Sequence, residues 1–256
     1  MIKKNYLLAD IGNSNTKIEV HTNEGTRLYK FSSLTPEGDF PATSWREIID
    51  THHIETLLIS SVIPGMDAQI RSLSAIGRLI LVCPDLYLPF EILYKTPYTL
   101  GTDRICLAAA AVSAPGWDPS TASLIISAGT CITFDVLVGR KYLGGSISPG
   151  IHMRAKAMHA FTNALPLIHP ANHQPACTDL PIIGQTTEEC LLAGSLQGAV
   201  FEINEYITRL SEKYKNLNIY LTGGDTSTLE KLIKSDIFAR PNMCLEGLNI
   251  LYRLNA

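Results

Sequence analysis

The chain carries one strand–turn–strand pattern twice, about half a chain length apart. The first copy, at 6–20, reads YLLADIGNSNTKIEV, and the second, at 124–136, reads LIISAGTCITFDV. In both, an apolar run meets a glycine and small hydrogen-bonding residues before the alternation typical of a β-strand resumes. Gly12 and Gly129 hold equivalent positions, 117 residues apart in a chain of 256. This repeat predicts a duplicated fold with two domains.

The length and composition allow two domains. Hydrophobic residues make up 46% of the 256 positions, which suffices for two cores in domains of about 100 to 150 residues. The stretch PGWDPS at 115–120 is typical of a junction between domains. We therefore expect an N-terminal domain over 1–117 and a C-terminal domain over 118–256.

Both expected domains open with three antiparallel strands, and the fold class is α/β. In the first domain the patterns predict the order βββαβαβ up to Val82, and the second domain repeats the three-strand opening from Leu124 to Ile147. This order resembles that of a ribonuclease-H-like domain, which the actin-like ATPase fold contains twice. The resemblance implies a duplicated ribonuclease-H-like fold with a nucleotide cleft between its two domains.

The turn after the first strand has the composition of a phosphate site. Asp10 ends an apolar strand and is an oxygen ligand suited to hydrated Mg²⁺. Gly12 lets a phosphate approach the backbone closely. Hydrogen-bond donors follow at Asn13, Ser14, Asn15 and Thr16. Taken alone, the motif fits equally well a hairpin in which Gly-Asn only makes the turn, and the second copy favours the phosphate site.

That second copy places Gly129 and Thr130 where the first has Gly12 and Asn13. Late in the chain, the run IYLTGG at 219–224 ends a further strand with two glycines, Gly223 and Gly224. Two such loops and a late Gly-Gly turn resemble the actin, sugar-kinase and Hsp70 superfamily, in which the Gly-Gly turn serves adenosine. The chain has neither the G-x-x-x-x-G-K-[ST] motif nor a G-x-G-x-x-G motif after a strand.

The segment at 94–111, YKTPYTLGTDRICLAAAA, predicts a loop followed by an alanine-rich helix that packs closely against a neighbour. Thr102 is the expected N-cap, and Asp103 falls in the first helical turn. By itself, the segment favours a carboxylate placed there by the helix dipole. The alternative is a general base, held by a rigid helix beside a loop that closes over a hydroxyl substrate.

Four stretches together resemble type III pantothenate kinase, in this order and at these distances over nearly the whole chain: DIGNSNTK, PYTLGTDR, SAGTCITFD and YLGGSISPG. The resemblance implies ATP-dependent phosphorylation of the primary hydroxyl of pantothenate to 4′-phosphopantothenate, the first step towards coenzyme A. It implies that Asp103 is the general base, that Asp10 holds Mg²⁺ through water, and that Lys17 takes phosphate charge.

The resemblance also implies the positions of both substrates. ATP and Mg²⁺ are expected at Asp10, Gly12, Asn13, Ser14, Thr16, Lys17, Gly129, Thr130, Gly223 and Gly224. Pantothenate is expected at the residues that match the family's substrate positions, Tyr94, Gly101, Thr102, Asp103, Arg104 and Thr187.

One position departs from the family pattern. Ser127 stands where the family usually has an aspartate that helps bind a monovalent cation, K⁺ or NH₄⁺. A neutral hydroxyl attracts a cation less than a carboxylate does, so we expect weaker dependence on the cation. Asp135 is a possible substitute, but the sequence does not determine which way its side chain faces.

Net charge and hydropathy limit which classes of partner the protein can have. The formal net charge is −3 and Lys and Arg are dispersed, which argues against nucleic acid or an acidic membrane surface as the partner. No run of about 18 apolar residues is present, and we expect a cytoplasmic protein. We also expect a homodimer, because the alanine-rich helix and the apolar segment 60–63 offer more packing surface than one small domain uses. The family that the chain resembles is dimeric.

The cysteines predict no disulfide framework or zinc site, because they lie far apart without a C-x-x-C pair. We expect most of the six to be reduced and buried: Cys83, Cys106, Cys131, Cys177, Cys190 and Cys244.

Two other functions compete with the pantothenate kinase. A sugar kinase of the same superfamily is usually longer, with insertions for which 256 residues leave little room. A non-catalytic regulator derived from the kinase is compatible with Ser127. Against the regulator, Asp10, Lys17 and Asp103 are all present.

Overall fold

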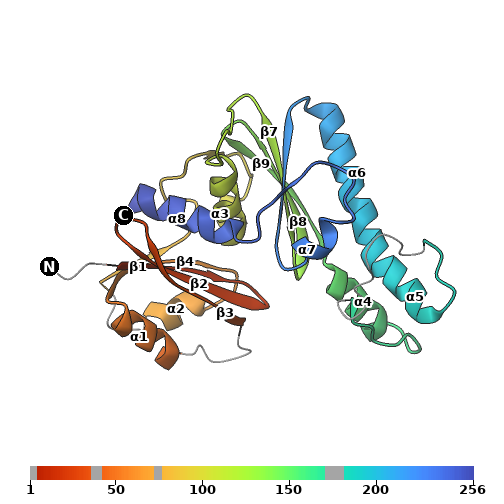
Figure 1. The fold of residues 1–256 in the computed structure, drawn as a ribbon, viewed down its shortest axis with the longest axis horizontal. Helices are drawn as coiled ribbons and strands as arrows, with labels where there is room; N and C mark the ends of the chain where they lie inside the picture. The colour runs from red at the N-terminus through yellow and green to blue at the C-terminus, as the bar shows by residue number, and fades with distance from the viewer. Residues whose placement is uncertain (1–4, 36–41, 72–76, 171–181) are drawn as a thin grey trace. The chain divides into compact units, whose positions relative to one another are not determined.

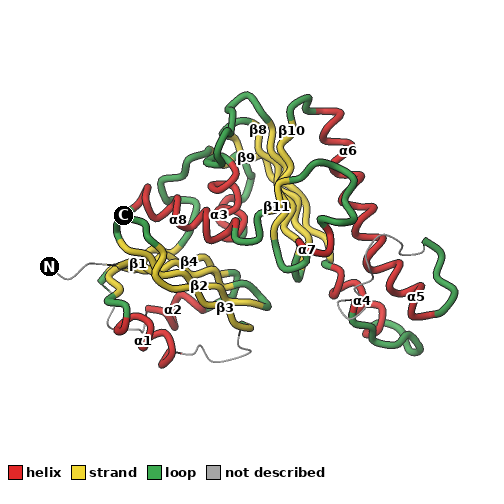
Figure 2. Tube along the Cα trace, viewed as in Figure 1, coloured by secondary structure: helices red, strands yellow, loops and turns green. Residues whose placement is uncertain are grey.

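The computed structural model describes residues 5–35, 42–71, 77–170 and 182–256. It consists of two compact units, the first made of 1–117 with 243–256 and the second of 118–242. Each unit is an α/β structure built on its own sheet (Figures 1 and 2). Among the described residues, no helix combines the length and the apolar character needed to cross a membrane.

The first unit confirms the predicted order βββαβαβ. Its sheet has the order β3-β2-β1-β4-β5, in which β1, β2 and β3 are antiparallel and β1, β4 and β5 parallel. The elements are β1 Asn5–Ile11, β2 Asn15–Thr22, β3 Arg27–Leu34, α1 Ala42–Thr51, β4 Ile54–Ser61, α2 Met66–Arg71, β5 Arg78–Leu81, β6 Glu91–Ile92, the 3₁₀ turn η1 Pro97–Thr99, α3 Thr102–Ala111 and α8 Met243–Asn255.

Helices cover both faces of this sheet, so β1 is buried on both sides as its apolar run predicts. On one face, α1 and α2 contribute Trp45 and Ile70 to a core with Leu7, Ile59 and other strand residues. On the other face lie α3 and α8 (Figure 1). Strand β1 therefore lies where elements from distant parts of the sequence meet.

The structure differs from the expected division of the chain at its C-terminal end. Helix α8 belongs to the first unit rather than to a domain over 118–256. It packs along α3, and a Cβ added at Gly247 would lie 1.9 Å from the backbone oxygen of Cys106. An apolar helical face predicts that a helix is covered, but it does not predict which sheet covers it.

The second unit repeats the opening meander. Its strands have the order β11-β10-β7-β8-β9, with β7, β8 and β9 antiparallel and β7, β10 and β11 parallel. The elements are β7 Ala122–Ala128, β8 Cys131–Val138, β9 Lys141–Pro149, α4 Ile151–Ala160, α5 Thr187–Leu192, the π-helical segment η3 Ala193–Gln197, α6 Gly198–Lys213, β10 Leu217–Thr222, α7 Thr226–Leu229 and β11 Phe238–Ala239.

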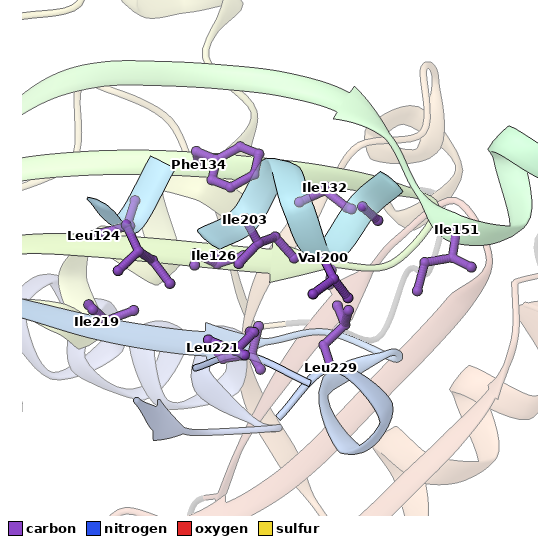
Figure 3. Packing of buried hydrophobic residues seen from close by; sticks show 14 of the residues in the cluster. Leu124, Ile126, Ile132, Phe134, Ile151, Val200, Ile203, Ile219, Leu221 and Leu229 are labelled. Atoms are coloured by element: carbon purple, nitrogen blue, oxygen red, sulfur yellow. The ribbon is translucent and has the colours of Figure 1, made fainter. Parts of the chain in front are cut away.

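Helix α6 builds the core of this unit against one face of the sheet. Val200 and Ile203 project from α6 towards Ile126 and Phe134 on the strands, as Figure 3 shows. Strand β9 needs a glycine at position 145, because a Cβ at Gly145 would lie 1.6 Å from the backbone oxygen of Phe134 on β8. The glycine pair Gly144-Gly145 within a strand predicts a close backbone approach, and the contact at Gly145 confirms it.

The sequence pattern predicts helix N-caps at Thr102 and at Thr187, and both predictions are wrong. Thr186, not Thr187, caps α5, since its hydroxyl accepts from the N–H of Glu189 in a reciprocal capping box. Gly101, not Thr102, is the N-cap of α3. The hydroxyl of Thr102 instead donates to the backbone oxygen of Ser61, a tertiary contact that local sequence preference does not reveal.

The expectation that most cysteines are buried is also wrong for the described residues. The five described cysteines are free thiols. Cys106 is buried, Cys190 is exposed, and Cys83, Cys131 and Cys244 are partly buried. Cys177 lies outside the described residues.

Candidate active site

Asp10 stands at the end of β1, beside Lys17 on β2 and Ser60 on β4. Burial raises the pKa of the Asp10 carboxyl to about 6, and the negative charge of Asp103 adds to this shift. A hydrogen bond from Cys244 and the charge of Lys17 act in the opposite direction. At neutral pH the carboxyl is therefore mostly ionised, although the protein environment opposes its charge.

This environment fits a cation. Asp10 and Asp103 come from β1 and α3 of the same unit, and each carboxylate makes the other's charge less favourable. A divalent cation held near them relieves that repulsion, and carboxylate oxygen is the ligand type that Mg²⁺ prefers. The described residues around Asp10 thus suit hydrated Mg²⁺.

The loop from Gly12 to Thr16 is held by its own backbone and by Thr35. The N–H of Gly12 donates to the oxygen of Asn15 at 3.0 Å. Thr35 donates its hydroxyl to the oxygen of Gly12 at 2.7 Å and its N–H to the oxygen of Ser14 at 2.9 Å. The loop is therefore shaped before any ligand binds.

The side chains of this loop divide into two sets. Asn13, Ser14 and Asn15 are exposed, as donors to a phosphate must be. Thr16 is buried and its hydroxyl lies 3.1 Å from that of Thr35. The structure thus assigns the Thr16 hydroxyl to shaping the loop, whereas the sequence suggested a donor to a ligand.

Asp103 is positioned by its neighbours at the start of α3. A Cβ added at Gly101 would lie 2.5 Å from the Oδ1 atom of Asp103, so the glycine leaves room for the carboxylate. The hydroxyl of Thr102 donates to the backbone oxygen of Ser61 at 3.0 Å and lies 3.0 Å from the hydroxyl of Ser60. Because Thr102 has one proton, Ser60 is the donor in the second bond, and together they tie α3 to the end of β4.

In the second unit, three turns meet. The N–H of Gly150, just before α4, donates to the oxygen of Thr130 at 3.1 Å, and a Cβ at Gly150 would lie 2.0 Å from the oxygen of Gly129. Gly223 has a φ of +101°, and its Cβ would lie 2.1 Å from the oxygen of Ala128. Only glycines permit these approaches, so the structure brings the Gly129–Thr130 turn and the Gly223–Gly224 turn together.

Comparisons with known proteins identify the family. Residues 6–209 match the family model described as type III pantothenate kinase. The chain belongs to the type III pantothenate kinase family. A protein named type III pantothenate kinase from Porphyromonas gingivalis is 36% identical over 97% of this chain and 98% of its own length. One from Christiangramia forsetii is 41% identical over 77% of this chain and 78% of its own.

Solved structures confirm the fold class of this kinase. A conserved Baf family protein from Campylobacter jejuni, named as a transcriptional activator, has a TM-score of 0.64 at 20% identity, covering 96% of this chain and 97% of its own. A ROK family glucokinase from Streptomyces griseus, solved with glucose and AMPPNP, has a TM-score of 0.53 at 12% identity, covering 95% and 97%. At these identities the likeness concerns the fold alone, and it supports the duplicated ribonuclease-H-like architecture.

The expected pantothenate residues of the kinase belong to both units. Tyr94 and the residues from Gly101 to Arg104 lie in the first unit, where Tyr94 is partly buried and Arg104 is buried. Thr187 lies in the second unit, exposed at the first residue of α5. A shallow hollow of about 370 Å³ in the first unit is lined by other residues, among them Asp85, Phe90 and Tyr98.

Asp225 lies beside the Gly223–Gly224 turn and is absent from the residues that the sequence singled out. It follows the Gly223–Gly224 turn directly, and its Oδ1 lies 4.0 Å from the Nε2 of His152 on α4. Its Oδ2 is buried and has no hydrogen-bond partner among the described residues. Burial raises the pKa of Asp225, and the proximity of His152 opposes this. An acidic residue directly after a Gly-Gly turn was the available signal.

The structure also determines the environment of Asp135. Its carboxylate is fully buried and accepts hydrogen bonds from the hydroxyls of Tyr142, at 2.5 Å, and Thr133, at 3.2 Å. Thr133 pairs across the sheet with Ser127, and Asp135 lies two positions further along the same strand. The side chains of Ser127, Thr133 and Asp135 therefore share one face of the sheet. Asp135 therefore faces the same side as Ser127, but these hydroxyls already engage its oxygens.

Proposed function

We propose that this kinase catalyses the ATP-dependent phosphorylation of the primary hydroxyl of pantothenate, giving 4′-phosphopantothenate in the first step towards coenzyme A. The observation that carries the proposal is the match of 6–209 to the type III pantothenate kinase family, together with 36% identity to a relative over nearly both full lengths. The ordered loop at Gly12 and the carboxylate pair at Asp10 and Asp103 agree with it.

In this proposal Asp103 is the general base. The carboxylate is set at the start of a helix that Thr102 ties to β4, and Gly101 leaves its oxygens uncrowded. A loose transition state for phosphoryl transfer requires alignment and charge neutralisation more than a strong base. A weakly basic aspartate that accepts the hydroxyl proton late is therefore sufficient.

Asp10 would hold Mg²⁺ through water, and the first loop would bind ATP phosphates. Mg²⁺ neutralises charge on the phosphoryl group during transfer. Lys17, beside Asp10 on the neighbouring strand, adds positive charge there. In the second unit, Gly129 and Thr130 would contact phosphate and Gly223 and Gly224 would serve adenosine, as two turns that the structure holds in contact.

An assay with a panel of acceptor substrates tests the proposed function. Purified protein is incubated with Mg²⁺ and ATP, and ADP formation is measured with pantothenate and with several hexoses. We expect ADP and a phosphorylated product with pantothenate only. Turnover with a hexose and none with pantothenate would favour a sugar kinase, and no turnover with any acceptor would favour a non-catalytic regulator.

Asp103→Asn tests the general base. The amide keeps the shape of the side chain but cannot accept a proton, so we expect turnover to fall by about 10² to 10⁴ while ATP still binds. Steady-state kinetics and calorimetric titration with ATP measure the two quantities. Near wild-type turnover in a folded variant would remove Asp103 from the reaction.

A further inference from the structure

The chain between β5 and α3, residues 82–101, carries two of the expected pantothenate residues, Tyr94 and Gly101. We call it the substrate segment. All of it lies within the described residues of the first unit, and its regular elements are only β6, of two residues, and the 3₁₀ turn η1, of three. Regular structure therefore does little to fix its shape, and contacts with neighbouring elements have to do so.

Asn255, the last residue of α8, holds the substrate segment at Tyr87. The N–H of Tyr87 donates to the Oδ1 of Asn255 at 2.9 Å, and the Nδ2 of Asn255 donates to the backbone oxygen of Tyr87 at 3.0 Å. The Nδ2 also donates to the oxygen of Leu251 at 2.9 Å, and the backbone oxygen of Asn255 accepts from Arg78, at the start of β5, at 2.8 Å. Asparagine suits this position because its amide carries one acceptor and two donors.

A second hydrogen bond extends this support to the end of the substrate segment. The hydroxyl of Tyr98 donates to the Oδ1 of Asp85 at 2.9 Å. Asp85 lies two residues before Tyr87, and Tyr98 lies in η1, three residues before Gly101. The bonds at Asp85 and at Asn255 thus connect α8 to the part of the segment that leads into α3.

Helix α8 supports α3 as well. Gly247 approaches the backbone of Cys106 closely, and Asp103, the proposed general base, lies in the first turn of the same helix as Cys106. Gly247 and Asn255 are eight residues apart on α8, which is about 12 Å along a helix. One helix therefore holds both Asp103 and the substrate segment in place.

We propose that Asn255 is a positioning residue, whose amide holds the substrate segment in the conformation that binds pantothenate beside Asp103. The inference rests on the proposed function, because it assigns a support to residues that bind pantothenate there. Without the amide, the segment adopts other conformations, and pantothenate binding has to order it, which lowers the affinity. The ATP residues expected on β1 and β2 lie outside the segment, so the affinity for ATP should not change.

Three variants separate this role from a general effect on α8. Asn255→Ala removes the amide. Asn255→Asp keeps its size and its acceptor, but it places a carboxylate against the oxygens of Tyr87 and Leu251. Asn249→Ala is the matched control, because this second asparagine of α8 accepts from the hydroxyl of Tyr6 on β1 at 2.8 Å. The control therefore loses a bond between α8 and the sheet.

Steady-state kinetics measure KM for pantothenate, KM for ATP and kcat, and hydrogen–deuterium exchange measures the protection of the Tyr87 amide. We expect both substitutions of Asn255 to raise KM for pantothenate by about three- to tenfold, as for the loss of one hydrogen bond. The kcat at saturation and KM for ATP should stay within about twofold of the unmodified protein. Exchange at Tyr87 should become faster in both variants, whereas Asn249→Ala should change neither KM for pantothenate nor this exchange.

An unchanged KM for pantothenate in Asn255→Ala, or in Asn255→Asp if the alanine variant does not fold, would overturn the proposal. An equal rise in Asn249→Ala, or a parallel rise in KM for ATP, would overturn it as well, because the effect would then come from a loosened helix. Failure of the proposed function is distinguishable, since the unmodified protein would then not phosphorylate pantothenate. The exchange at Tyr87 would still show whether Asn255 orders the segment, and unchanged exchange would overturn the inference by itself.

Discussion

At the scale of single residues, the Asp10 carboxyl lies in an environment that disfavours its ionised form. The pKa of about 6 lies above the usual value of 3.8, so the folded protein favours the protonated form. The cost to stability is absent below about pH 4 and grows as the pH rises to about 6, because the unfolded chain ionises first. Above pH 6 the full cost remains unless a cation binds.

Asp10→Asn should therefore separate stability from function. Without Mg²⁺ at pH 7, we expect the variant to be more stable than the unmodified protein by on the order of 2 kcal/mol, whereas its use of Mg²⁺-ATP should fall. Urea unfolding and Mg²⁺-dependent kinetics measure the two effects. A variant that is less stable, or unfolded, would indicate that Asp10 has a structural role.

Ser127 should change the response to K⁺ and NH₄⁺. A hydroxyl offers a monovalent cation no full charge, and the oxygens of Asp135 on the same face already accept hydrogen bonds from Tyr142 and Thr133. We expect weak dependence of the rate on K⁺, and stronger dependence in Ser127→Asp. Activity is titrated with K⁺ against a large inert cation, and an absolute K⁺ requirement in the unmodified protein would contradict this.

At the scale of secondary-structure elements, the contact between α3 and α8 completes the first unit. Helix α3 is buried from Arg104 to Ala111, and α8 packs along it with Gly247 against Cys106. Small side chains on α3 and a glycine on α8 allow this approach. The residues near the start of α3, Asp103 among them, are therefore held by a helix from the far end of the chain.

Gly247→Ala should be strongly destabilising, although alanine favours helix. Its Cβ would lie 1.9 Å from a backbone oxygen that cannot move freely, and we expect a loss of about 2 to 3 kcal/mol. Gly198→Ala on α6 is the matched control, since its nearest neighbour is a side-chain atom of Arg154 at 3.8 Å. We expect that variant to gain up to about 1 kcal/mol. Equal effects in thermal or urea unfolding would contradict the packing argument.

At the scale of the whole molecule, the proposed homodimer depends on the family rather than on spare apolar surface. The alanines of α3 are already covered within the chain, since Ala108 to Ala111 are fully buried. The surface argument from this helix therefore no longer applies. We still propose a homodimer, as in the family that the sequence resembles.

Light scattering combined with activity across a dilution series tests the dimer. We expect a mass near twice the chain mass of 28.0 kDa, with activity falling as the protein dissociates. A monomer with full activity at all concentrations would contradict the proposal.

The sequence by itself determined the features whose cause is local. Strand–turn–strand patterns predicted the two meanders, and the composition after Asp10 and around Asp103 predicted where polar groups end strands and begin helices. Hydrophobic periodicity depends on the nearest neighbours along the chain, so these predictions needed no partner. The repeat between Gly12 and Gly129 added the duplicated architecture.

Only the tertiary structure decided which distant residues meet. It placed α8 in the first unit, Thr35 on the loop at Gly12, and Cys244 beside Asp10, more than 230 positions away in the chain. An apolar stripe shows that a helix is covered but not by what, and a lone threonine or cysteine has no pattern. Such contacts arise from the packing of whole elements, and for that reason the surroundings of Asp10 could not be predicted from the sequence.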